Sequence, residues 1–139
     1  MQRHLLLTGT TLILVGLVLG TILDWFANPA IASDAHVAGI QHGMLLMILG
    51  MSWRYTDLGK LELPCAYLNI IGLIGIWAAF LAGAVLGDPY PSASKVTYSM
   101  FVVSSTLLIL GFGVFLYGLF RGTGAYEAEA MPDRGHQTR

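Results

Sequence analysis

Four long runs of apolar residues dominate the chain, and short polar stretches separate them. The runs cover residues 5–26, 35–53, 65–87 and 98–120. Each holds close to the ~20 residues that an α-helix needs to cross the hydrocarbon core of a bilayer. Long unbroken apolar runs favour helices, in which every backbone polar group is satisfied internally. The pattern therefore predicts an all-α polytopic membrane protein with four transmembrane helices in an antiparallel bundle.

The connections between the runs are short and rich in proline and small polar residues, which interrupt helices. Their sequences are ANPAIASD, RYTDLGKLELP and DPYPSASKVT. The last stretch of the chain is polar and mixed in charge. We therefore predict one transmembrane domain over residues 1–121 and a flexible cytoplasmic tail over residues 122–139.

Composition and charge agree with a membrane protein. Of the 139 residues, 55% are hydrophobic and only 11% are charged, whereas soluble domains carry about a quarter charged residues. The net charge is −1 and no basic patch occurs, which argues against a nucleic-acid partner. Lys95 lies on one side of the predicted helices, and the other Lys and Arg residues lie on the opposite side: Arg3, Arg54, Lys60, Arg121, Arg134 and Arg139. The positive-inside rule then predicts both termini in the cytoplasm and the chain in the inner membrane.

Glycines recur at the spacing with which membrane helices approach one another. In lipid, helices associate through close backbone contact, because burial brings no hydrophobic gain. Three GxxxG pairs and one near equivalent occur: Gly16 and Gly20, Gly39 and Gly43, Gly83 and Gly87, and Gly72 and Gly75. These residues predict packing surfaces first, either within one chain or between chains.

Two histidines interrupt the second apolar run, and the first of them is His36. Ser33 and Asp34 are good N-cap residues, so we expect the helix to begin there and His36 to lie in its first turn. The helix dipole and partial burial would then favour a neutral imidazole. A neutral ring with a free lone pair is the form that binds a metal or a haem iron.

Gly39 and Gly43 follow His36 at i+3 and i+7 and lie near the same face of the helix. Positions without side chains beside an axial histidine would let a flat macrocycle lie against the helix. They would accommodate a neighbouring helix equally well. If the macrocycle lies there, bulk at Gly39 should lower haem content more than bulk at Gly16.

The second histidine, His42, lies six residues after His36. At 3.6 residues per turn it points about 120° away from His36 and lies about 9 Å along the axis. The two rings therefore cannot bind one metal ion side by side, although they could flank one cavity. Ionisable residues near the middle of a membrane helix are functional by default, whereas His36 alone could also be an interfacial residue with a backbone partner.

Other polar residues have simpler interpretations. We expect Asn69 to bond across helices, and the single Cys65 has no partner for a disulfide or a thiolate metal site. The absence of a CxxCH motif excludes a covalently attached haem. Three methionines of the second run have the spacing of core packing: Met44, Met47 and Met51.

The segment DAHVAGIQHGMLL, residues 34–46, resembles the family of small membrane isomerases that includes hydroxylaminobenzene mutase and styrene oxide isomerase. RHLLLTGTTLILVGLVLG and GIWAAFLAGAVLG are similar to the first and third spans of that family. The similarity covers most of residues 2–121. The resemblance implies a four-helix protomer that assembles as a homo-oligomer, a trimer, and carries haem b.

The resemblance also implies roles for individual residues. The family's haem ligand opens the second span and matches His36, and its ferric iron acts as a Lewis acid. Gly39 matches the glycine that follows three residues later. His42 and Gly43 stand where the family has an Asn-Gly pair, so a polar group is kept and its chemistry changes.

In span three the chain departs further from the family. The acid and the tyrosine that styrene oxide isomerase carries there correspond to Gly75 and Gly83, which puts styrene oxide itself in doubt as the substrate. The implied function is the rearrangement of an apolar aromatic epoxide or arylhydroxylamine, with His36 binding haem and His42 catalytic. The alternatives are a haem-b electron-transfer or quinone-reactive subunit, and a cofactor-free scaffold or carrier.

Overall fold

The computed structural model describes the backbone of residues 1–130 and the side chains of residues 1–122. This part of the chain is helical and has no strand. Four helices are long and apolar enough to cross a membrane, which confirms the predicted fold class. They are α1 (Gln2–Leu19), α2 (Pro29–Ser52), α3 (Glu62–Leu86) and α4 (Lys95–Ala130). Short 3-10 turns lie between them: η1 (Leu23–Trp25), η2 (Trp53–Tyr55) and η3 (Gly59–Leu61).

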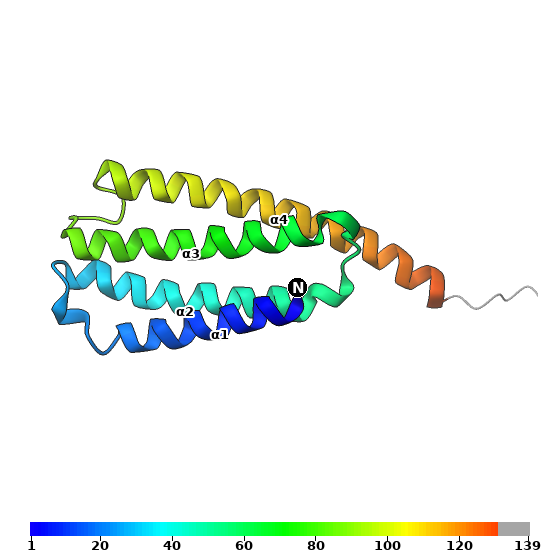
Figure 1. Ribbon diagram of the computed structural model, residues 1–139, viewed down its shortest axis with the longest axis horizontal. Helices are drawn as coiled ribbons and strands as arrows, with labels where there is room; N and C mark the ends of the chain where they lie inside the picture. The colour runs from blue at the N-terminus through cyan, green and yellow to red at the C-terminus, as the bar shows by residue number, and fades with distance from the viewer. Residues whose placement is uncertain (131–139) are drawn as a thin grey trace, which may run out of the picture.

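The helices lie side by side in the order in which they occur in the chain (Figure 1). The α1–α2 pair and the α3–α4 pair each form a tightly packed antiparallel hairpin, and α2 against α3 joins the two hairpins. Contact between α1 and α3 is slight. The arrangement leaves large apolar side chains exposed on α1 and α4, among them Leu14, Ile109 and Phe120. Such surfaces suit lipid or another membrane helix.

Glycines set the close approach within each hairpin, as the sequence predicts. A Cβ on Gly43 would lie 2.6 Å from the Gly9 carbonyl oxygen of α1. A Cβ on Gly72 would lie 2.9 Å from the Leu108 backbone nitrogen of α4. Gly87 has a different role, because it ends α3 in the left-handed conformation at φ 70°, which a residue without Cβ adopts readily.

Helix α2 begins at Pro29, and Asn28 is its N-cap. The Asn28 Oδ1 accepts hydrogen bonds from the backbone N–H of Ala30 at 3.1 Å and of Ile31 at 3.3 Å. The predicted start at Ser33 and Asp34 is therefore wrong, and His36 lies in the second turn of the helix. An Asn N-cap followed by Pro at the first helical position is a strong start signal. The helix therefore begins there and continues through Ser33 and Asp34.

The other helix ends also differ from the apolar runs. Helix α1 ends at Leu19, short of residue 26, and the chain turns through η1 before α2 begins. Helix α4 continues through Ala130, beyond the predicted end at residue 120. The remainder of the predicted tail, residues 131–139, lies outside the described residues.

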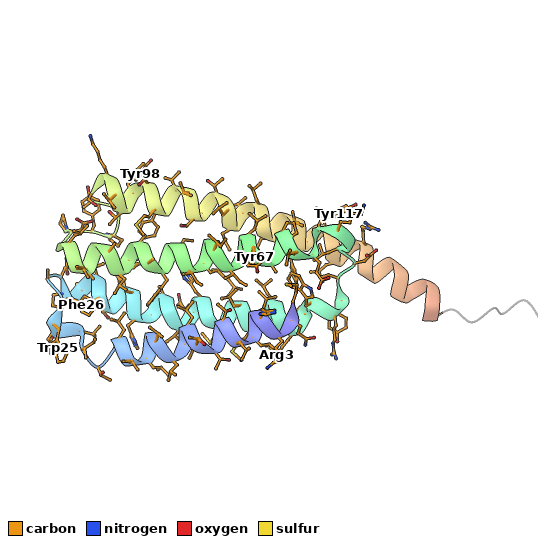
Figure 2. The ribbon with its side chains drawn as sticks, in the orientation of Figure 1. Arg3, Trp25, Phe26, Tyr67, Tyr98 and Tyr117 are labelled. Atoms are coloured by element: carbon orange, nitrogen blue, oxygen red, sulfur yellow. The ribbon has the colours of Figure 1, made fainter. Side chains whose placement is uncertain are left out.

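One end of the molecule carries most of the basic residues of the described chain. There the Arg121 guanidinium lies 3.0 Å from the Asp57 carboxylate, and the N-terminal amine lies 3.9 Å from Glu62. Figure 2 places Arg3 and Tyr117 towards this end, and Trp25 and Tyr98 at the opposite end. The charge asymmetry expected from the sequence is therefore an asymmetry between the two ends of the folded chain.

Candidate functional site

The His36 ring lies between α2 and the end of α1. Its Nδ1 is 2.8 Å from the backbone oxygen of Gly16. A carbonyl oxygen only accepts hydrogen bonds, so Nδ1 carries the proton and donates it. The ring packs over Gly20, where a Cβ would lie 2.7 Å from two of its atoms. Two glycines of α1 thus provide both the space and the acceptor for the histidine.

The tautomer set by Gly16 leaves the lone pair of His36 on Nε2. This atom has no hydrogen-bond partner among the described residues. It is also not fully enclosed, because within the described side chains Asn69 Oδ1 is the only fully buried polar atom without a partner. A ligating histidine typically donates its other ring N–H to a carbonyl or carboxylate, which fixes the tautomer and orients the ring. His36 has this arrangement.

The Gly16 carbonyl is well suited as an acceptor because it belongs to the last turn of α1. Carbonyls in that turn carry the negative end of the helix dipole. The Gly16 oxygen also accepts a hydrogen bond from the Gly20 N–H at 3.2 Å. The end of α1 therefore holds the Nδ1 proton in place by electrostatics as well as by geometry.

His42 has the same kind of bond to a different helix. Its Nδ1 lies 3.1 Å from the backbone oxygen of Leu73 in α3, so its Nε2 also keeps an open lone pair. His36 faces α1 and His42 faces α3, in agreement with the angular separation expected from the sequence. The two rings do not share a partner.

Gly39 and Gly43 lie in the packing between helices. A Cβ on Gly39 would be 3.1 Å from the Gly16 Cα and 2.9 Å from the Trp77 indole nitrogen. A Cβ on Gly43 would meet the backbone of α1. The sequence allowed these glycines to contact either a macrocycle or a neighbouring helix, and the structure shows a neighbouring helix. No space remains there for a macrocycle within one protomer.

Trp77 of α3 joins the same region. Its Nε1–H donates to the Ala35 carbonyl of α2 at 3.0 Å, one residue before His36. Sequence reasoning did not single out Trp77, or the carbonyl of Gly16. The GxxxG spacing of α1 marked Gly16 as a contact residue, but a carbonyl leaves no trace in a side-chain pattern.

Asn69 does not bond across helices, contrary to the prediction. It is fully buried and donates through Nδ2 to the Cys65 carbonyl of its own helix at 2.8 Å. No group of three His, Cys, Asp or Glu side chains in the described chain could hold a metal ion. A haem needs fewer protein ligands, because the porphyrin supplies four nitrogens and the protein one axial histidine.

Comparison with known proteins shows which family the chain resembles. A family model described as styrene oxide isomerase matches residues 1–120. Two similar proteins of Ectopseudomonas oleovorans are hydroxylaminobenzene mutases. HabB is 33% identical over 88 residues, 63% of this chain and 54% of HabB, and HabA is 33% identical over 88 residues, 63% of this chain and 65% of HabA. The match thus spans between half and two thirds of these relatives. No solved structure matches the chain significantly.

Proposed function

Since the chain belongs to the styrene oxide isomerase family, we propose that it is a membrane isomerase that rearranges an apolar aromatic epoxide or arylhydroxylamine. The relatives named as mutases support an intramolecular rearrangement. The observation that carries the proposal is the bond from His36 Nδ1 to the Gly16 oxygen at 2.8 Å, which leaves Nε2 free.

His36 fits the role of the residue that would hold haem b. Its ring is oriented by a backbone carbonyl, its tautomer is set, and its Nε2 is neither hydrogen-bonded nor fully enclosed within the described residues. A ferric haem held there would supply Lewis-acid chemistry towards the substrate oxygen. Gly39 and Gly43 contribute to this site indirectly, because their close contact with α1 brings the Gly16 carbonyl to His36.

The chain's own residues provide the rest of the mechanism. Helices α1 and α2 keep the His36 ring fixed, so little reorganisation is needed when a ligand binds Nε2. The open Nε2 of His42 orients the substrate oxygen or relays a proton as the bond rearranges. The apolar surroundings exclude water, which prevents hydrolysis of a reactive cation.

The enzyme has a defined orientation in the membrane and a defined assembly. The basic end faces the cytoplasm, as the positive-inside rule requires, and the chain lies in the inner membrane. The exposed apolar faces of α1 and α4, together with a His36 Nε2 that is not fully enclosed, support a homo-oligomer. A trimer agrees with the family resemblance.

The test is turnover by the purified protein without a reductant. Incubation with styrene oxide and with phenylhydroxylamine should yield, from at least one of them, an isomeric product of unchanged mass. The protein should show a Soret band of a five-coordinate ferric haem. A six-coordinate low-spin spectrum without turnover would identify an electron carrier, and a protein without a Soret band or turnover would be a scaffold or carrier.

A further inference from the structure

A groove of about 350 Å³ lies between α1 and α3, in the membrane-spanning part of the molecule. Binding sites for small molecules range from about 300 to 1,000 Å³, so this groove has room for one aromatic ring with a short substituent. Neither histidine lines it. Its lining comes from Leu7, Thr8, Thr11, Leu12, Val15, Ile74 and Trp77.

The two threonines of the groove have hydroxyl groups without a partner among the described residues. Other threonines of the membrane helices bond to the preceding turn. Thr10 Oγ1 donates to the Leu6 carbonyl at 2.8 Å, and Thr106 Oγ1 donates to the Val102 carbonyl at 2.8 Å. In hydrocarbon an unpaired hydroxyl is unfavourable. Thr8 and Thr11 therefore present two hydrogen-bonding groups that remain available to a ligand.

Trp77 forms the part of the groove wall that is linked to the histidine site. Its indole N–H is bonded to the Ala35 carbonyl at 3.0 Å, and its ring lies against Gly39. The side chain is thus fixed through its indole N–H, and it also lines the groove. A fixed aromatic side chain favours an aromatic ligand, through stacked or edge-to-face contact.

We propose that this groove binds the substrate as it arrives from the lipid, as an aromatic molecule with one hydrogen-bonding oxygen or nitrogen group. The identity of the substrate rests on the proposed function, whereas binding in the groove rests on its own geometry. Thr8 and Thr11 bond to the polar group, and Leu12, Ile74 and Trp77 contact the ring. An acyl chain would leave both hydroxyls unpaired, so a lipid tail fits less well.

The experiment uses a photoreactive benzyl alcohol that carries a diazirine on its ring. The full-length protein in lipid nanodiscs is irradiated with this probe, and labelled residues are located by mass spectrometry. We expect saturable labelling between Leu7 and Val15 and at Ile74 or Trp77, with competition by unreactive 2-phenylethanol. A diazirine of the same size without the hydroxyl should need a several-fold higher concentration.

A matched pair of variants tests the hydroxyls directly. Thr8→Val combined with Thr11→Val should weaken the saturable labelling roughly tenfold, which is the scale of two lost hydrogen bonds. Thr10→Val should leave it unchanged, because that hydroxyl bonds to its own helix. Equal effects of the double variant and of Thr10→Val would overturn the proposal.

Four further outcomes distinguish a failure of the groove proposal from a failure of the proposed function. Uniform, unsaturable labelling of exposed residues such as Leu14 and Val18 would show partition into lipid and overturn the proposal. Groove residues that remain unlabelled would overturn it as well. Saturable groove labelling without any turnover would support ligand binding in the groove and contradict the isomerase function. Turnover with labelling elsewhere would support the isomerase function and contradict ligand binding in the groove.

Discussion

The two helical hairpins both pack through glycine contacts, but they differ in how far they bury their polar side chains. In α1–α2, Gly16 meets the backbone of Gly39, and in α3–α4, Gly72 meets the backbone of Leu108. The α1–α2 contact holds His36, whose Nε2 has no partner among the described residues and is not fully enclosed. The α3–α4 contact encloses Asn69, whose Oδ1 has no partner and no access to a ligand.

The difference shows that an unsatisfied polar atom in a membrane helix is not by itself a functional group. Asn69 lies fully buried between two helices, so its free oxygen has structural consequences only. His36 combines a fixed tautomer with an open lone pair, and this combination allows it to bind a ligand. Accessibility and orientation, more than polarity, distinguish the two hairpins.

The largest effect should come from bulk at the two glycine contacts. Gly16→Leu should cost about 3 kcal/mol or more of stability, as strong overpacking does, because the new Cβ would lie 3.1 Å from the Ile40 backbone nitrogen. It should also abolish haem binding, since it displaces the carbonyl that orients His36. Gly72→Leu should destabilise to a similar degree, yet its folded fraction should keep haem. Haem per folded chain and thermal unfolding in detergent measure both effects.

Gly113→Leu is the control for these variants, because no atom lies within 4 Å of a Cβ at that position. It should match the wild type in stability and in haem content. If Gly16→Leu and Gly72→Leu lose haem in equal proportion, the hairpins do not differ in function. Gly39→Leu should behave like Gly16→Leu, since the two residues contact each other. The sequence alone had predicted a larger loss of haem from bulk at Gly39 than from bulk at Gly16.

A second, intermediate effect should come from His42. His42→Leu should keep haem and lose about 10²-fold in turnover, the usual scale for a positioned acid–base group. The loss of the bond to Leu73 should cost little stability, because that oxygen lies within α3. His42→Asn should retain part of the activity. Unchanged turnover of the Leu variant would make His42 a structural residue.

The smallest effect should come from Asn69. Asn69→Leu should change the free energy of unfolding by no more than about 1 kcal/mol, because it removes an unpaired buried oxygen and keeps the number and branching of the side-chain heavy atoms. Haem content and turnover should stay at the wild-type level. A variant that folds normally and loses turnover would place Asn69 in the catalytic machinery and remove the contrast between the hairpins.

The sequence predicted the four helices and the glycine contacts because apolar length and residue size are properties of the chain itself. It also predicted that His36 and His42 face different neighbours, since helical periodicity sets that angle. The sequence also contains the correct start signal of α2, Asn28 followed by Pro29, but the prediction placed the start at the Ser33–Asp34 pair.

The partner of His36 was not readable from the sequence. It depends on which turn of α1 lies opposite α2, and that register is set by the packing of both helices. For the same reason Asn69 could not be assigned to its own helix in advance: Gly111 of α4 closes over it, and a Cβ there would lie 2.8 Å from Asn69 Nδ2. Side-chain periodicity shows the face of a residue, and only the fold shows what that face meets.

The most direct test of the central claim compares the haem content of His36→Gly and His42→Gly, measured by absorbance per chain with and without added imidazole. Both variants place a glycine within α2, so the helix cost is matched at about 1 kcal/mol. We expect His36→Gly to lose haem and to regain it when imidazole occupies the space left by the ring, while His42→Gly keeps haem throughout. Full haem content in His36→Gly without imidazole would contradict the account.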